Sequence, residues 1–239
     1  MSNPPAIIEV RGLVKKIDSG SHEVEILRGV DFAVPAGQFV AIMGPSGSGK
    51  STLLGLLAGL DRLTAGQIFL DGEEINRLSE DQMALLRARK IGFVFQSYHL
   101  VPTLTAEENV MLPIDLAGDG SLGPGRAREL LESVGLADRL DHYPVQLSGG
   151  EQQRVALARA FVSKPPVVMA DEPTGNLDST NGRHVLEMLL DLNRREKTTL
   201  ILVTHDQDLA SQADRLITLK DGEIVADELV RTAAEPVVG

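Results

Sequence analysis

Residues 44–51, Gly-Pro-Ser-Gly-Ser-Gly-Lys-Ser, form a glycine-rich loop between an apolar run and a segment with helical character. Backbone N–H groups in such a loop can point at phosphate oxygens, because glycines allow a tight path that a β-carbon would obstruct. Lys50 would reach the β- and γ-phosphates of a nucleotide, and the Ser51 hydroxyl can ligate Mg²⁺. A flexible Gly-Ser loop at a strand end would not explain Lys50 and Ser51 at these positions. The sequence therefore predicts a phosphate-binding loop.

Two adjacent carboxylates, Asp171 and Glu172, follow the apolar run 167–170, which is typical of a buried strand. Adjacent residues on a strand point in opposite directions, so the two carboxylates can serve separate tasks. We expect Asp171 to hold Mg²⁺ and Glu172 to orient the water that attacks the γ-phosphate. A solvated acidic turn before Pro173 is the alternative, but it leaves the phosphate loop unexplained.

Gln96 and His205 occupy similar positions, each just beyond an apolar run (91–95 and 200–204). Gln96 could ligate the metal or a water, and His205 could donate a hydrogen bond to a γ-phosphate oxygen. Either residue alone would be an ordinary polar residue at a strand end. Their significance comes from belonging to the same set as the phosphate loop and the carboxylates.

Residues 147–152, Leu-Ser-Gly-Gly-Glu-Gln, combine a helix start with two glycines. Ser148 followed by Glu151 has the pattern of a capping box. That pattern does not explain glycines in the first turn, where each costs about 1 kcal/mol relative to Ala. Exposed N–H groups at a helix start can bind an anion. Because loop 44–51 already holds one side of a nucleotide, we expect a second copy of the chain to cover the γ-phosphate, with residues 176–178 linking the two sites.

The composition excludes several functional classes. The chain has no Cys, so it has no disulfide framework. A formal net charge of −11 and an aromatic content of 3% argue against a nucleic-acid partner. No run of about 18 apolar residues occurs, and residues 1–5 lack the pattern of a signal peptide. We therefore expect a cytoplasmic chain that does not itself span a membrane.

The order of the segments predicts an α/β chain with a mainly parallel sheet. Residues 7–34 alternate apolar and polar residues, which indicates an N-terminal antiparallel β subdomain. Strand signals fade after residue 97 and helical periodicity returns at 126–134, which indicates an inserted α-helical subdomain. The predicted boundaries are a single domain at 7–228, with a core at 7–96 and 164–228, a helical subdomain at 97–163 and a short C-terminal tail at 229–239.

Taken together, the ordered motifs resemble the ATP-binding subunits of ABC transporters over about residues 7–226. The resemblance implies a P-loop ATPase core and a head-to-tail homodimer with two ATP and Mg²⁺ between the phosphate loops and the 147–152 signatures. It implies a catalytic set of Glu172, His205, Gln96 and Lys50, and an Mg²⁺ set of Ser51, Gln96 and Asp171. It places at the nucleotide, from the same protomer, Gly44, Pro45, Ser46, Gly47, Ser48, Gly49, Lys50, Ser51, Thr52 and Ile17. From the opposite protomer it places Ser148, Gly149, Gly150, Gln152 and Asp178.

Segments 92–97, 104–110 and 171–178 resemble the LolD, MacB and FtsE group within this family, and 156–161 and 200–206 are most similar to its YbbA-like members. The group is associated with mechanotransmission, in which ATP-driven closure moves a periplasmic part of a permease. The resemblance implies a peripheral position on the cytoplasmic face of the bacterial inner membrane and a YbbP/MacB-type permease partner. It also implies a link to a periplasmic lysophospholipase-like protein, and hence export or extraction of lipid-like or hydrophobic cargo.

Three other functions use some of the same features. An FtsE-like regulator, which activates an extracytoplasmic enzyme without moving cargo, uses the same motor and stays open. Soluble ABC ATPases of DNA repair or translation commonly carry tandem nucleotide domains, long coiled coils or zinc inserts, which the sequence lacks. A non-hydrolysing binding module would not need both Glu172 and His205.

Ile17 departs from the family pattern, which usually has an aromatic residue here to stack on adenine. An aliphatic side chain offers contact area without ring stacking, so we expect weak discrimination between ATP and GTP. A second feature is the apolar segment 98–104, Tyr-His-Leu-Val-Pro-Thr-Leu, directly after Gln96. It could contribute to a groove for a cytoplasmic helix of the permease, or it could pack the helical lobe, and both interpretations stay open.

Overall fold

The computed structural model describes residues 6–18, 20, 23–118 and 123–230. The chain divides into two compact units: unit 1 contains residues 1–78 and 199–239, and unit 2 contains residues 79–198. Residues 1–5, where a signal peptide was not expected, and residues 231–239 of the predicted tail lie outside the described residues. The predicted boundaries of the helical subdomain, 97 and 163, stay a prediction.

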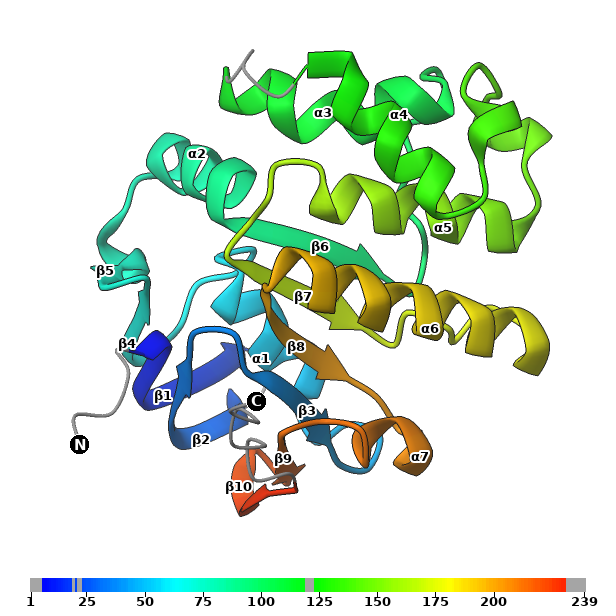
Figure 1. The fold of residues 1–239 in the computed structure, drawn as a ribbon. Coiled ribbons are helices and arrows are strands. Elements are labelled where there is room, and N and C mark those ends of the chain that lie inside the picture. Colours follow the sequence, from blue (N-terminus) through cyan, green and yellow to red (C-terminus); the bar gives the residue numbers. More distant parts are fainter. Residues whose placement is uncertain (1–5, 19, 21–22, 119–122, 231–239) are drawn as a thin grey trace, which may run out of the picture. The chain divides into compact units, whose positions relative to one another are not determined.

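An antiparallel sheet forms the N-terminal part of unit 1 (Figure 1). Its strands are β1 (Ala6–Asp18), β2 (Glu23–Pro35), β4 (Ala65–Leu70) and β5 (Glu73–Glu74), in the order β2-β1-β4-β5. The alternating apolar residues predicted the buried face, since Ile8 and Val10 are 1% and 2% exposed while Glu9 between them is not buried. β4 and β5 are joined by an Asp71-Gly72 turn, a residue pair that favours tight hairpin turns.

A second set of strands in unit 1 is mostly parallel. The strands are β3 (Phe39–Met43), β8 (Thr199–Val203), β9 (Arg215–Lys220) and β10 (Glu223–Leu229), in the order β10-β9-β3-β8. β3 pairs in parallel with β8 and β9, while β9 and β10 form an antiparallel hairpin. Every residue of β8 is buried, which explains its uninterrupted apolar sequence. Unit 1 also contains α1 (Lys50–Leu57), η1 (Ile75–Arg77) and α7 (Gln207–Ala210).

Unit 2 combines a parallel strand pair with helices. β6 (Ile91–Phe95) and β7 (Val167–Asp171) pair from Ile91↔Val167 to Phe95↔Asp171. The helices are α2 (Glu80–Lys90), α3 (Ala106–Ala117), α4 (Gly123–Ser133), α5 (Gly149–Phe161) and α6 (Ser179–Glu196), with 3₁₀ turns η2 (Ala137–Arg139) and η3 (Pro144–Gln146). α5 packs closely on β6, because a β-carbon on Gly92 would lie 2.0 Å from the Ala160 carbonyl oxygen.

The sequence indicated helical segments at α1, α4 and α5, whereas α3 was not singled out. The capping box predicted at Ser148 is present at the start of α5, and a second one, of Ser79 with Gln82, starts α2. α3 was not predicted, because Pro113 lies inside it and Pro disfavours a helix interior. A third capping box, of Thr105 with Glu108, starts this helix, and burial of Val110 and Ile114 offsets the cost of the proline.

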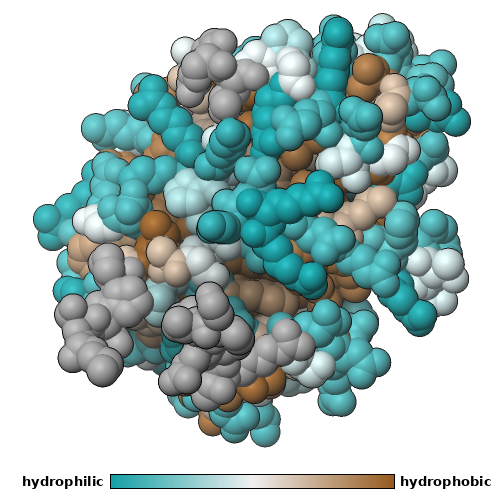
Figure 2. Space-filling model, in the orientation of Figure 1, coloured by the Kyte–Doolittle hydropathy of each residue, from teal (hydrophilic) through white to brown (hydrophobic). Residues whose placement is uncertain are grey.

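On the face drawn in Figure 2, hydrophilic residues predominate among the coloured atoms, and hydrophobic residues form mostly small groups between them. Among the described residues, no helix is both long enough and apolar enough to cross a membrane.

Candidate nucleotide site

The phosphate loop in unit 1 connects β3 to α1, and two of its glycines are required by the fold. Gly44 has φ 152°, and a β-carbon there would lie 1.9 Å from the Leu219 carbonyl oxygen. Gly49 caps α1 with φ 99°, and a β-carbon there would lie 2.9 Å from Leu27 Cδ2. Side chains at these positions would displace the loop, so the glycines fix its backbone path.

The chemical groups of the loop fit a phosphate. Lys50 is buried in the first turn of α1, and its Nζ donates to the carbonyl oxygens of Gly44 and Pro45, both at 2.9 Å. Ser48 Oγ is buried without a hydrogen-bond partner among the described residues. The N-cap residue of α1, Gly49, has no side chain that could cap the first N–H groups of the helix. An ammonium group, a hydroxyl and uncapped helix N–H groups therefore converge on one loop, as an anion site requires.

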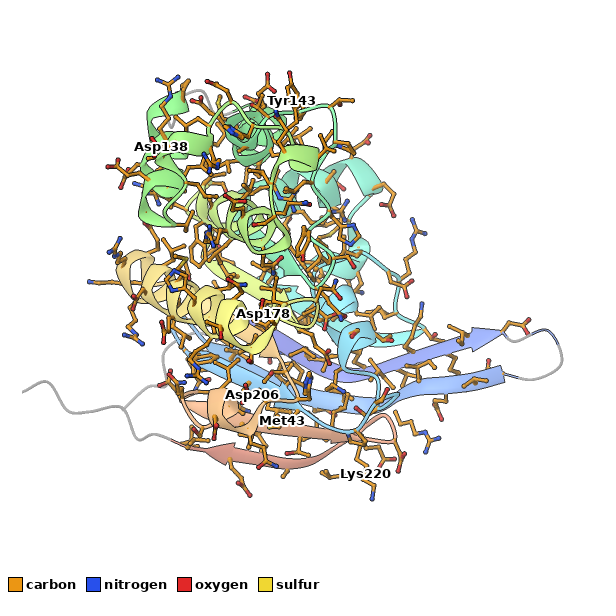
Figure 3. All side chains as sticks on the ribbon, turned by 90° about the vertical axis from the view of Figure 1, so that its right-hand side faces the viewer. Met43, Asp138, Tyr143, Asp178, Asp206 and Lys220 are labelled. Carbon is orange, nitrogen blue, oxygen red and sulfur yellow. The ribbon has the colours of Figure 1, made fainter. Side chains whose placement is uncertain are left out.

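His205 lies at the same edge of the parallel strands as the phosphate loop. It follows β8, where the Thr204 N–H donates to Ile42 O in β3 at 3.3 Å. The Asp206 N–H donates to Thr204 Oγ1 at 3.0 Å, and Asp206 caps α7. Figure 3 shows Asp206 beside Met43, the last residue of β3. Unit 1 thus carries the exposed His205 on the edge from which the phosphate loop starts.

In unit 2, Glu172 follows β7 with a left-handed backbone. Its φ is 42°, which is uncommon for a residue other than Gly, Asn or Asp. The Gly175 N–H donates to Glu172 O at 3.0 Å, and the Leu177 N–H donates to Thr174 O at 3.0 Å. The pleat of β7 includes Asp171 but ends before Glu172. The direction of the Glu172 side chain is therefore set by a turn. The sequence had instead suggested the alternation of side chains along a strand as the cause.

Gln96 is exposed just beyond β6 and lies against the turn that follows Glu172. Asn176 Nδ2 donates to Gln96 O at 3.0 Å. A β-carbon on Gly175 would lie 2.5 Å from Gln96 Nε2, so glycine at 175 leaves room for this amide. The structure therefore brings together Gln96 and the segment that carries the carboxylates.

The signature at the start of α5 is a capping box with an additional ion pair. Ser148 Oγ accepts from the Glu151 N–H at 3.3 Å and donates to Glu151 Oε2 at 2.7 Å, while Arg139 Nε donates to Glu151 Oε1 at 3.2 Å. The Ser148 N–H is the largest cause that lowers the pKa of Glu151, followed by the Ser148 hydroxyl and Arg139. Gln152 Nε2 donates to Leu147 O at 3.0 Å.

The two signature glycines differ in what the fold demands. A β-carbon on Gly149 would lie 2.8 Å from Tyr98 Oη, so packing accounts for this glycine. A β-carbon on Gly150 would meet nothing closer than 3.7 Å, which is an ordinary contact. Packing within the described residues therefore does not explain glycine at position 150.

The remaining predicted residues are Asp178 and Ile17. Asp178 caps α6 by accepting from the Thr180 and Asn181 N–H groups, both at 3.1 Å, and from Asn181 Nδ2 at 2.6 Å. The Asn181 amide is the first cause that lowers the pKa of Asp178. Ile17 lies in β1 opposite Val24 and is 46% exposed, so its side chain is accessible for contact.

Sequence reasoning missed Gln153, which is fully buried on α5. Its Nε2 donates to Pro173 O at 2.6 Å and to Phe95 O at 3.3 Å. The signal that could have revealed it is a polar residue on a buried helix face, three residues after Gly150 and four before Leu157. Within the described ranges, no cluster of three or more His, Cys, Asp or Glu could hold a metal. The predicted Mg²⁺ set contains one carboxylate, Asp171, beside Ser51 and Gln96, and it stays a prediction.

The strands, the phosphate loop and the loop chemistry define an α/β nucleotide-binding chain of the P-loop class. The sequence model of the ABC transporter family matches residues 27–175. The chain is 52% identical over 219 residues to the uncharacterized ABC transporter ATP-binding protein YbbA of Escherichia coli (strain K12), covering 91% of this chain and 96% of that protein. It is 49% identical over 220 residues to the lipoprotein-releasing system ATP-binding protein LolD of Xanthomonas oryzae pv. oryzae (strain MAFF 311018), covering 92% and 90%.

Solved structures give the same result. The ATP-binding cassette MJ0796, in a dimeric post-hydrolysis state bound to ADP and Pi, has a TM-score of 0.87 and 41% identity, covering 94% of this chain and 99% of that chain. This chain belongs to the ABC transporter family, as an ATP-binding subunit of the LolD/MacB group. It is an ATPase that uses ATP and Mg²⁺, and the predicted fold class is confirmed.

Proposed function

We propose that this chain is the ATP-hydrolysing motor of a membrane ABC complex and works as a head-to-tail homodimer around two ATP. The observation that carries this proposal is Gly150, where a β-carbon would meet nothing closer than 3.7 Å. Gly150 is buried, and a β-carbon there would make only ordinary contacts, so packing within the described residues does not require the glycine, whereas close approach of a second copy at the start of α5 would. The dimeric state of the MJ0796 relative supports the same arrangement.

Within each protomer the catalytic groups have separate tasks. Lys50 offsets phosphate charge, and Ser51, Gln96 and Asp171 hold Mg²⁺. Glu172 orients the attacking water, and His205 donates a hydrogen bond to a γ-phosphate oxygen. The opposite copy closes the site with Ser148, Gly149, Gly150, Gln152 and Asp178.

We also propose a YbbP/MacB-type permease partner and a peripheral position on the cytoplasmic face of the inner membrane. Similarity to LolD, which is named for lipoprotein release, supports lipid-like or hydrophobic cargo for export or extraction, and a lysophospholipase-like protein as a further partner. The docking segment, residues 98–104, is held through its backbone, since Arg159 donates to Tyr98 O at 2.9 Å and to His99 O at 2.7 Å. Val101 is 37% exposed on it, so apolar contact with a permease helix is available there.

Replacing Glu172 with Gln tests the motor. We expect hydrolysis to fall by about 10²–10⁴-fold, since the general base is lost, while Mg²⁺ and ATP trap a dimer. Light scattering and phosphate release measure the two effects. Glu187→Gln, at an exposed site on α6, is the matched control and should behave as wild type. A Glu172→Gln protein that stays monomeric with saturating ATP and Mg²⁺ contradicts the proposal.

Replacing Leu100 with Asp tests the docking segment. A charge in an apolar contact should abolish stimulation of hydrolysis by the permease while nucleotide affinity stays unchanged, because the loop 44–51 is untouched. Reconstitution in vesicles with the permease measures the stimulation. Leu116→Asp, at a leucine that is 70% exposed outside the segment, is the control. Lost nucleotide binding in the Leu100 variant would show that the segment packs the lobe instead.

A further inference from the structure

Gln153 joins α5 to the ends of both strands of unit 2. Its side chain is 0% exposed, and its Nε2 donates to Pro173 O at 2.6 Å and to Phe95 O at 3.3 Å. Pro173 is the residue after Glu172, and Phe95 is the residue before Gln96. One amide therefore binds the backbone next to Glu172, which orients the attacking water in the proposed function, and next to Gln96, which binds Mg²⁺ in it.

The chemistry fixes the orientation of this amide. Both partners are carbonyl oxygens, which only accept, so the NH₂ group must face them and each of its N–H groups serves one carbonyl. The pairing of β6 with β7 ends at Phe95↔Asp171. Beyond that pair, the Gln153 bridge and the Asn176–Gln96 hydrogen bond hold together the segments that carry Gln96 and Glu172.

The Gln153 amide matters mainly through its donors. Its Oε1 is buried and has no hydrogen-bond partner among the residues that the structure describes. An apolar side chain of similar length would remove this unfavourable atom, but it would leave the carbonyl oxygens of Pro173 and Phe95 without this donor. The two N–H groups therefore hold the point where the two segments meet.

We propose that Gln153 is a positioning residue for hydrolysis, which holds the Gln96 and Glu172 segments at the spacing that the reaction needs. It lies one helical turn after Gly150, on the same face of α5, so engagement of the signature by the opposite copy reaches both segments through one rigid helix. The inference rests on the proposed function, because it uses the roles given there to Gln96, Glu172 and Gly150.

Gln153→Met keeps the length of the side chain and removes both donors. We expect kcat to fall about 10- to 100-fold, as for other displacements of about 1 Å at a reacting centre, with KM for ATP unchanged within about twofold. Gln153→Asn keeps the donors but shortens their reach, so it should give an intermediate kcat, and it serves if the Met variant does not fold.

Asn193→Leu is the matched control. Asn193 Nδ2 also donates twice, to Thr198 O at 2.7 Å and to Thr198 Oγ1 at 2.8 Å, at the end of α6. We expect this variant to lower the melting temperature while kcat is kept. Unchanged kcat in Gln153→Met, or equal losses of kcat and stability in both variants, overturns the inference.

A double variant separates this inference from the proposed function. If Gln153 acts through Glu172, adding Gln153→Met to Glu172→Gln should change single-turnover hydrolysis by less than about twofold. A further tenfold loss shows that Gln153 acts elsewhere and overturns the inference alone. Wild-type turnover in Glu172→Gln by itself overturns the proposed function, and this role of Gln153 with it.

Discussion

Glu151 accepts several hydrogen bonds at the first turn of α5. Its carboxylate accepts from the Ser148 N–H at 2.8 Å, from the Ser148 hydroxyl at 2.7 Å and from Arg139 Nε at 3.2 Å. These donors lower the pKa of Glu151 from 4.5. A carboxyl group whose pKa is depressed on folding stabilises the fold fully above its unfolded pKa, and that contribution is lost as the pH falls through the lower, folded pKa.

Glu151→Gln should therefore reduce the dependence of the free energy of unfolding on pH in the acid range. Glutamine can still accept from the Ser148 N–H, but it has no charge to lose. We expect the drop in the free energy of unfolding between about pH 5.5 and pH 3.5 to be smaller than in the wild type. Urea titrations at both pH values measure it, with the exposed Glu132→Gln as control. An equal drop in the Glu151 variant and the wild type would contradict this assignment.

The types and spacing of reactive residues were readable from the sequence, but their backbone geometry was not. Lys50, Ser51 and the carboxylates form a rare combination, so residue type alone indicated nucleotide chemistry. The left-handed φ of 42° at Glu172 is not encoded by residue type, because Glu has no preference for that region. The contacts of Gln153 could not be inferred either, because they join three segments that are distant in sequence.

At the scale of elements, α3 organises the docking segment through one buried side chain. Asn109 is 0% exposed, and its Oδ1 accepts from the Val101 N–H at 2.8 Å. Its Nδ2 donates to the carbonyl oxygens of Val101, Leu104 and Thr105 at 3.1, 3.0 and 2.9 Å. The amide therefore replaces regular backbone pairing for a segment that has no strand or helix of its own.

Asn109→Leu should release this segment. The substitution keeps the volume and leaves several backbone groups without partners, so we expect a loss of about 2–3 kcal/mol in the free energy of unfolding. Hydrogen exchange at Val101 should become faster as well. Asn76→Leu, at an exposed turn, is the control and should cost at most about 1 kcal/mol. Unchanged exchange at Val101 would mean that another contact holds the segment.

At this scale, helix-capping residues were reliable sequence signals for where a helix begins, whereas stabilisation by packing could not be predicted from the sequence. Ser148 with Glu151 predicted the start of α5 through local side-chain chemistry, and the same pattern, of Ser79 with Gln82, starts α2. α3 persists around Pro113 because its apolar residues pack in unit 2, and such tertiary stabilisation has no local pattern.

At the scale of the whole molecule, the proposed completion of the site by a second copy would make turnover depend on protein concentration. We expect the specific activity to fall as the protein is diluted below the dimer dissociation constant, because a monomer lacks the opposite signature. Adding excess Glu172→Gln protein should restore turnover at the wild-type site, since that partner still supplies Ser148 and Gly150. Phosphate release across a dilution series measures both effects, and constant specific activity without rescue would contradict them.

The hairpin of β9 and β10 forms one wall of the phosphate loop, since Leu219 O occupies the space of a Gly44 side chain and the Gly222 N–H donates to Ser48 O at 3.2 Å. The strands that flank β3, β8 and β9, come much later in the sequence than the loop. A nascent chain on the ribosome therefore carries the loop sequence long before it can hold the loop in shape. Nucleotide affinity should arise only after β8, β9 and β10 have been synthesised and folded, so a chain that lacks them should not hydrolyse ATP.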